Sequence, residues 1–391
     1  MNNPFEMSRR VQSLPPYIFA KIDRIKQDEI KKGRKLISLG IGDPDLPTPA
    51  FVIDRMISSI KNPSNHRYPS YRGLIEFRKA VSRWYLSRFN VALDPENEIL
   101  TLIGSKEGVA HIPLAFVNPG EGVLVPDPGY PAYQASTLLA DGIPLRFSLK
   151  EKNGFLPDFS ELEELIKRGP CVRLLFLNYP NNPTSASASL EFFKEIVAFA
   201  KKHQIIVCHD NAYSEIYYDG KKQLSFLETP GAKDIGCEFH SLSKTFNMAG
   251  WRVGFLVGNA KIIEGLAQVK TNIDSGVFNV CQEAGIEALD HYEPFCTELR
   301  KVYQERREIL IPALQAIGLN CKKPDATFYA WARLPEGRKS EEFVMDLIER
   351  KGIIATPGNG FGEYGEGYVR FTLCSDVSVL KQVAEALKAS L

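Results

Sequence analysis

The segment from Ser241 to Gly254, S-L-S-K-T-F-N-M-A-G-W-R-V-G, holds a lysine among hydroxyl side chains with an arginine shortly after it. The amine of Lys244 can form a Schiff base with an aldehyde, while Ser241, Ser243 and Arg252 can bind a phosphate by hydrogen bonds and charge. An exposed turn is the ordinary place for a lysine, but it does not explain these residue types together. The segment therefore predicts a site for a phosphorylated aldehyde cofactor.

Three further motifs follow apolar runs in the sequence. Asp210, in C-H-D-N-A-Y, follows the run 205–208, where a buried carboxylate costs several kcal/mol unless it is paired. The motif D-x-x-Y alone more often caps a helix. The strings N-Y-P-N-N-P-T (178–184) and G-S-K-E-G (104–108) are ordinary turns by themselves, although the backbone at a helix start can also hold a phosphate.

Taken in order, these motifs resemble those of the fold-type I pyridoxal-phosphate-dependent aminotransferases (class I/II family), and the resemblance covers nearly the whole chain. It implies pyridoxal 5'-phosphate on Lys244, with Asp210 pairing with the pyridine nitrogen and Tyr213 and Asn182 binding the phenolic oxygen. Lys244, Asp210 and Tyr213 are the implied catalytic residues. The sequence departs from the family at Ser185, where glycine is usual, and this puts the local turn in doubt.

The resemblance also implies roles for residues that line the rest of such a site. Ser105 and the Lys106 amide would contact the phosphate, and Tyr130 would stack on the pyridine ring. Arg370 would bind the substrate α-carboxylate, and the backbone of Gly42 would approach it. Tyr68 would reach the phosphate of the neighbouring subunit, which implies a homodimer with shared active sites.

The implied reaction is transamination between an amino acid and a keto acid. The strings 68–73, 104–108 and 126–133 look most like those of bacterial LL-diaminopimelate aminotransferases, which use 2-oxoglutarate on the route to lysine. Lys106 would then bind the distal carboxylate, Tyr17 would close the pocket, and Ser275 stands where asparagine is more usual. Aminotransferases for aspartate, alanine or aromatic amino acids, and carbon–sulfur lyases on the same scaffold, remain the alternatives.

The elements that must position these residues have the pattern of an α/β protein. Short apolar runs alternate with helical stretches such as 190–202, which predicts a mostly parallel sheet covered on both faces, with ligands at the carboxyl ends of its strands. After about residue 285 the pattern becomes that of a smaller α+β domain. We expect a large cofactor-binding domain over 36–285 and a small domain made of 1–35 and 286–391.

Composition limits the class of partner. The chain has 48 Lys plus Arg against 47 Asp plus Glu, a formal net charge of +1, and no basic stripe, so we expect neither nucleic acid nor a membrane as a partner. Its seven scattered cysteines are typical of reduced thiols in a cytoplasmic protein. Its six histidines lack metal-ligand spacing, so no metal is expected.

Overall fold

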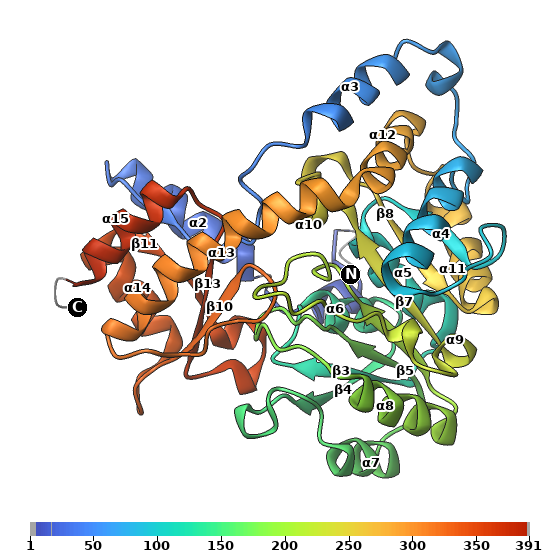
Figure 1. Ribbon diagram of the computed structural model, residues 1–391. Coiled ribbons are helices and arrows are strands. Elements are labelled where there is room, and N and C mark those ends of the chain that lie inside the picture. The colour runs from blue at the N-terminus through green and yellow to red at the C-terminus, as the bar shows by residue number, and fades with distance from the viewer. Residues whose placement is uncertain (1–4, 17, 389–391) are drawn as a thin grey trace.

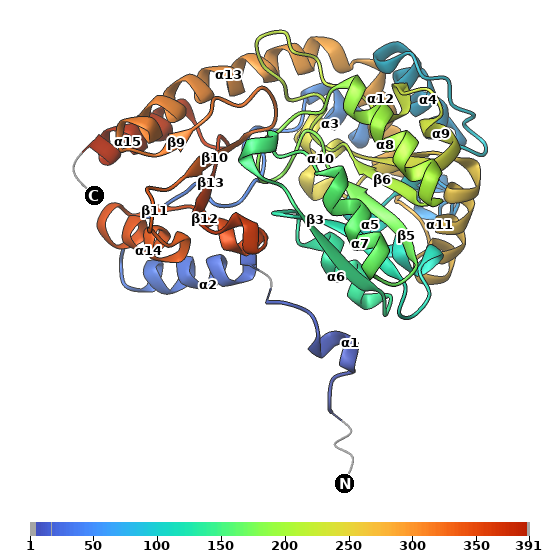
Figure 2. The ribbon, with the colours of Figure 1, turned by 90° about the horizontal axis from the view of Figure 1, so that it is seen from below.

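The computed structural model describes residues 5–16 and 18–388, which form two lobes (Figure 1). The long helix α13 (Tyr292–Ala316) runs from the large lobe to the small one and lies along both in Figure 2. Among the described residues, no helix is long and apolar enough to cross a membrane.

The large lobe is built on a seven-stranded sheet in the order β2-β8-β7-β6-β5-β3-β4. β8 is antiparallel to both of its neighbours, and the remaining four pairings are parallel. The strands are β2 (Ile99–Leu102), β3 (Gly122–Asp127), β4 (Ile143–Ser148), β5 (Val172–Leu177), β6 (Ile206–Asp210), β7 (Gly236–Ser241) and β8 (Gly254–Gly258). The predicted mostly parallel sheet is confirmed.

Helices bury both faces of this sheet, which is why its strands are apolar on both sides. Leu174 and Phe176 pack in one core with α5 (Ser105–Phe116), α6 (Ala132–Leu139) and α11 (Ala260–Ile273). Leu175 and Leu177 pack in the other with α4 (Ile75–Phe89), α7 (Phe159–Arg168) and α8 (Leu190–His203). The other helices of this lobe are α3 (Ala50–Ser59), α9 (Ala232–Ile235), α10 (Leu242–Thr245) and α12 (Asn279–Asp290).

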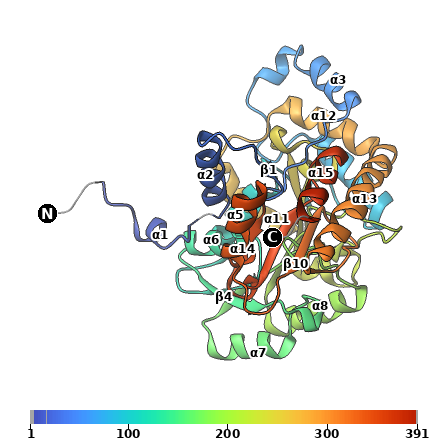
Figure 3. The same cartoon turned by 90° about the vertical axis from the view of Figure 1, so that its left-hand side faces the viewer.

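The small lobe has an antiparallel sheet in the order β12-β13-β10-β9 and a separate parallel pair, β1-β11. Its strands are β1 (Ile37–Ser38), β9 (Asn320–Cys321), β10 (Tyr329–Arg333), β11 (Ile353–Ile354), β12 (Thr356–Pro357) and β13 (Tyr368–Thr372). The helices are α2 (Ile18–Lys31), α14 (Ser340–Lys351) and α15 (Val377–Lys388). α2 and α14 are neighbours in Figure 3, whereas α15 packs against α13. Ile22, Leu347 and Val383 of these helices share one core.

The N-terminal segment reaches both lobes. The short helix α1 (Arg9–Gln12) stands away from the body in Figure 2 and contacts the large lobe through an ion pair between Arg10 and Asp141 at 2.9 Å. β1 belongs to the small lobe because it pairs with β11. The domain boundaries near residues 36 and 285 stay a prediction.

Candidate active site

A cavity of about 280 Å³ lies at the carboxyl ends of the parallel strands, where the two lobes meet. Its lining draws on sequence positions from 41 to 370. Twelve of the predicted site residues line it: Gly42, Ser105, Lys106, Tyr130, Asn182, Asp210, Tyr213, Ser241, Ser243, Lys244, Arg252 and Arg370. The topology therefore gathers into one site the motifs that are dispersed along the sequence.

Asp210 ends β6 and is buried in the cavity wall. Its Oδ2 accepts a hydrogen bond from the Tyr133 hydroxyl at 2.8 Å, whereas its Oδ1 is buried and has no hydrogen-bond partner. Burial raises the pKa of Asp210 above its ordinary value, and the Tyr133 hydrogen bond only partly opposes this rise. One carboxylate oxygen is thus available to a donor that enters the cavity.

Lys244 lies in the four-residue helix α10, directly after β7. The hydroxyl of Ser241 caps this helix by accepting from the Ser243 backbone N–H at 3.2 Å. The Lys244 amine donates to the Gly42 carbonyl at 2.9 Å. Burial lowers the pKa of Lys244, so its neutral, nucleophilic form is easier to reach than that of an exposed lysine.

One end of the cavity has the chemistry of an anion site. α5 begins at Ser105, so the backbone N–H groups of its first turn face this end. The Ser243 hydroxyl is buried without a hydrogen-bond partner. Arg252 has a left-handed backbone (φ 55°), and its guanidinium donates to the carbonyls of Ala249 at 2.9 Å and Ile103 at 3.4 Å. Gly104, which precedes the helix, has φ +75°, a backbone conformation that favours glycine.

The opposite side of the cavity carries a buried arginine from the small lobe. Arg370, in β13, donates to Asn182 Oδ1 at 2.6 Å and to the Gly40 carbonyl at 2.7 Å. Its guanidinium carbon lies 4.2 Å from the centre of the Tyr329 ring and 4.6 Å from that of Phe361. These contacts hold the guanidinium in a fixed plane, the geometry that suits recognition of a carboxylate.

Tyr213 and Tyr329 join the lobes across the cavity, with their hydroxyl oxygens 2.9 Å apart. Burial raises the pKa of both hydroxyls, so they stay protonated and can donate. A Cβ on Gly42 would collide with the ring and hydroxyl of Tyr329. Gly42 therefore allows its backbone to lie close to both Tyr329 and Lys244.

The turn after the Asn-Pro loop accommodates Ser185 in the conformation that glycine favours, with φ 60°. Its hydroxyl donates to the Tyr329 carbonyl at 2.8 Å and lies 2.9 Å from the Thr327 hydroxyl. These bonds tie the loop that carries Asn182 to β10 of the small lobe. The departure from glycine at this position is offset by contacts that glycine could not make.

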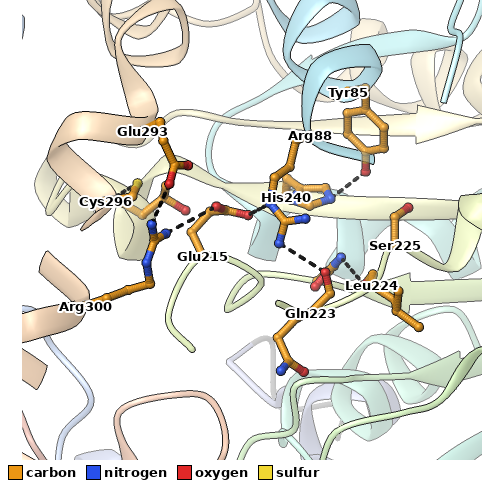
Figure 4. A network of polar contacts seen from close by, with 12 residues as sticks. Tyr85, Arg88, Glu215, Gln223, Leu224, Ser225, His240, Glu293, Cys296 and Arg300 are labelled. Atoms are coloured by element: carbon orange, nitrogen blue, oxygen red, sulfur yellow. Dashed lines mark hydrogen bonds and ion pairs between the residues drawn. The ribbon is translucent and has the colours of Figure 1, made fainter. Parts of the chain in front are cut away.

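A polar network supports the segment that follows Asp210 (Figure 4). Glu215 is fully buried and pairs with Arg88 of α4 at 3.0 Å and with Arg300 of α13 at 3.9 Å. Arg300 also pairs with Glu293 at 2.8 Å. Because breaking a buried ion pair is costly, this network fixes the chain just after Tyr213 relative to both helices.

Two residues singled out in the sequence do not line the cavity. Tyr68 is 88% exposed on the surface of the large lobe, and Ser275 is exposed in the loop between α11 and α12. Tyr17 lies outside the described residues. No group of three or more His, Cys, Asp or Glu side chains within residues 5–16 and 18–388 is arranged to hold a metal ion.

Sequence reasoning missed several residues that the cavity contains, among them Tyr133, Asn178 and Tyr329. Tyr133 and Asn178 stand inside strings that were already singled out, so a buried hydroxyl and amide beside Asp210 could have been considered. Asn178 donates to the Asp210 carbonyl at 2.7 Å. Tyr329 gives no such signal, because only the packing of the lobes brings it to Tyr213.

The chain matches known proteins over almost all of its length. Residues 34–387 match the family model "Aminotransferase class I and II". It is 52% identical to the LL-diaminopimelate aminotransferase of Aquifex aeolicus over 98% of this chain and 99% of that protein, and 52% identical to that of Maridesulfovibrio salexigens over 98% of each. The solved structure of substrate-bound BacF from Bacillus subtilis is 35% identical, with a TM-score of 0.93 over 98% of this chain and 97% of that chain. The chain belongs to the class I and II aminotransferases, the family that its sequence motifs resemble.

Proposed function

We propose that this aminotransferase holds pyridoxal 5'-phosphate on Lys244 and exchanges the amino group of LL-diaminopimelate with 2-oxoglutarate, on the route to lysine. The observation that carries the choice of substrate is the 52% identity, over nearly full length, to relatives named LL-diaminopimelate aminotransferase. The choice of cofactor rests on the cavity itself.

The residues of the cavity fit this cofactor. The unpartnered Oδ1 of Asp210 suits a protonated pyridine nitrogen, and the α5 N-terminus, the Ser243 hydroxyl and Arg252 suit a phosphate. Lys244 lies in the same cavity with a lowered pKa, as an amine that attacks an aldehyde requires. When bound, pyridoxal phosphate supplies an electron sink for the negative charge left when the substrate α-carbon loses its proton.

Three residues of the chain would then have separate roles in the reaction. Lys244 would act as the general base that takes the substrate α-proton, and its lowered pKa favours the neutral amine that this role needs. Asp210, oriented by Tyr133, keeps the ring nitrogen charged. Tyr213 stays protonated and donates to the phenolic oxygen, with Tyr329 fixing its hydroxyl.

Two cations would bind the two ends of the substrate. Arg370, held by Asn182 and the Gly40 carbonyl, would receive the carboxylate next to the reacting carbon. Lys106 is exposed and lines the same cavity, so it can meet a second carboxylate on a long side chain. Tyr130 would stack on the ring, and Tyr17 would cover the substrate, as the sequence predicts.

We also propose a homodimer in which Tyr68 of the partner subunit completes each site. In one subunit this residue is almost fully exposed and outside the cavity. Exposed apolar side chains also occur on α3, which packs on α12, and around the loop between α11 and α12: Ile53, Ile57, Ile60, Tyr71, Ile273 and Phe278. Such surfaces are typical of subunit interfaces.

The substrate assignment is tested by comparing LL-diaminopimelate, aspartate, alanine and phenylalanine as amino donors to 2-oxoglutarate. We expect the highest kcat/KM for LL-diaminopimelate, and a Lys106→Met variant to lose that preference while it retains activity with alanine. A higher kcat/KM for any of the other three donors would refute the assignment. Release of ammonia and a keto acid without an acceptor would instead indicate a lyase.

A further inference from the structure

A buried lysine outside the cavity connects the wall of the site to the surface segments that carry Tyr68 and Ser275. Lys270, near the end of α11, is completely buried. Its Nζ lies 2.7 and 3.0 Å from the two carboxylate oxygens of Asp274 and 3.3 Å from Oε2 of Glu107. A buried ammonium needs such pairing, so the position of each carboxylate depends on Lys270.

The contact with Glu107 connects Lys270 to the cavity of its own subunit. Glu107 lies in the first turn of α5, and its Oε2 also accepts from the Ile103 backbone N–H at 3.0 Å. The Ile103 carbonyl accepts from Arg252. Lys270 therefore acts, through Glu107, on the strand end that supports Arg252 and the start of α5.

The contact with Asp274 connects Lys270 to the exposed surface. Asp274 Oδ1 accepts from the Gly276 backbone N–H at 2.7 Å, which shapes the loop around Ser275. Gly276 has φ +93°, and a Cβ there would meet the Ser70 carbonyl and the Pro69 ring. This loop is thus in close contact with the segment that begins at Tyr68.

A second contact ties the same segment to α11. Arg72 pairs with Glu264, six residues before Lys270 in the same helix, at 2.6 Å. The segment 68–73 therefore has two contacts with α11 and the loop that follows it. Arg72 pairs with Glu264, and Pro69 and Ser70 lie against Gly276, whose N–H donates to Asp274. Lys270 also pairs with Glu107, which directly follows Lys106 of the cavity wall.

We propose that Lys270 is a positioning residue that orients, through Asp274 and the loop 274–277, the segment 68–73, which carries the Tyr68 that completes the partner subunit's active site, while it supports its own site through Glu107. Each Lys270 of the dimer then affects both active sites, its own through Glu107 and the partner's through Asp274. This inference rests on the homodimer with shared sites proposed above.

The test uses heterodimers that hold a single working site, purified with two different affinity tags. One chain carries Lys244→Ala, so only the other chain can turn over. Adding Lys270→Met to the inactive chain removes the ammonium only from the segments that enter the working site. We expect the KM of the amino donor and the pyridoxal-phosphate concentration that half-restores the visible absorption band to rise about 5- to 50-fold, with a smaller change in kcat.

Lys261→Met on the inactive chain is the matched control, because Lys261 is exposed on the same helix. We expect it to change neither quantity. If Lys270→Met impairs folding, the pair Asp274→Asn and Asp274→Ala replaces it. The asparagine keeps an acceptor for the Gly276 N–H and should retain more cofactor affinity than the alanine.

An unchanged working site with Lys270→Met, or equal effects of the two Asp274 variants, overturns this inference. The shared-site proposal is tested separately by Tyr68→Phe on the inactive chain. If that variant weakens cofactor binding in the working site and Lys270→Met does not, only the role of Lys270 is wrong. If Tyr68→Phe has no effect, or the protein is a monomer in sedimentation, the shared sites themselves are wrong.

Discussion

Asp210 and Glu238 are buried carboxylates on the neighbouring strands β6 and β7, yet their surroundings differ. Glu238 accepts hydrogen bonds from Tyr85, His209, Asn211 and the Phe226 backbone N–H, and its Oε1 lies 2.8 Å from His240 Nε2. Burial raises the pKa of Glu238, but the bonds from the two histidines outweigh it and hold that pKa well below its ordinary value. Asp210 lines the cavity and accepts one hydrogen bond from a side chain, at Oδ2, whereas its Oδ1 has no hydrogen-bond partner.

The arrangement around His209 shows how completely the Glu238 cluster is satisfied. His209 Nε2 faces the Tyr179 backbone N–H at 3.2 Å, and because that group can only donate, Nε2 accepts. The ring proton therefore lies on Nδ1 and points to Glu238 at 2.8 Å. A saturated carboxylate stabilises the fold, whereas an unsatisfied one marks a place where a ligand must supply the missing donor.

The largest expected effect is on activity at Asp210. Asp210→Asn should lower kcat/KM by about 10²–10³, because an amide does not keep the ring nitrogen charged. Burial raises the pKa of Asp210 in the folded protein above its value in the unfolded chain. The ionised carboxylate therefore destabilises the cofactor-free protein at neutral pH. This effect disappears below the unfolded pKa, where Asp210 is protonated in both states. The asparagine variant should therefore raise the free energy of unfolding of the cofactor-free protein at pH 7, by about 1 kcal/mol. Denaturant unfolding and steady-state kinetics measure the two; a less stable variant with normal kinetics would contradict both.

Glu238→Gln should give the opposite result. Glutamine has one acceptor oxygen where glutamate has two, so its NH2 group would face a donor. We expect the free energy of unfolding to fall by about 3 kcal/mol, while kcat/KM changes less than tenfold. Glu298→Gln is the control, because Glu298 pairs with Lys301 on the exposed surface of α13 and should cost under about 0.5 kcal/mol. A Glu238→Gln protein as stable as this control would show that the cluster is not a source of stability.

The pH dependence of stability should separate the two carboxylates as well. The folded pKa of Glu238 lies below its unfolded value near 4.5, so its contribution is complete above that pH and is lost as the pH falls through the folded pKa. The stability difference between the unmodified protein and Glu238→Gln should thus be constant from pH 8 to about 6 and shrink below about 4.5. Thermal unfolding across this range checks it, and a difference that grows on acidification would reverse the assigned sign.

The smallest effect is expected at Tyr133. Tyr133→Phe removes the donor to Asp210 Oδ2 but keeps the ring that stacks on Phe176, with centroids 4.9 Å apart. We expect kcat/KM to fall about threefold to tenfold, the value of one hydrogen bond. Tyr179→Phe loses a hydroxyl contact to the Phe155 carbonyl outside the cavity and should have normal kinetics. Equal losses in the two variants would mean that Tyr133 does not act through Asp210.

The same contrast explains what the sequence could predict. The continuous apolar runs of β5 and β6 predict buried strands directly, whereas Glu238 and His240 interrupt the apolar pattern of β7 (G-C-E-F-H-S). These residues are tolerated in a buried strand only because they satisfy one another in three dimensions. β4 lies partly exposed at the sheet edge, and Pro144 and Arg146 leave it without a continuous apolar run.

The site was predictable where its residues stand in local motifs. Asn182, Asp210, Lys244 and Arg252 each lie in such a string and line the cavity. Tyr329 and the antiparallel direction of β8 depend on contacts between distant segments, which no local pattern records. Lys270 was missed for the same reason, since its partner Glu107 is 163 residues away.

The cofactor is expected in the cavity whose polar groups lack hydrogen-bond partners, on Lys244, and not at a cluster whose polar groups already satisfy one another. The purified protein is loaded with pyridoxal phosphate and treated with borohydride, which makes a bond between a lysine amine and the cofactor permanent. Peptide mass spectrometry then locates the modified lysine. We predict modification at Lys244 and none at Lys270, the buried lysine whose amine is already paired with Asp274 and Glu107. Modification at any other lysine with Lys244 unmodified would contradict the claim.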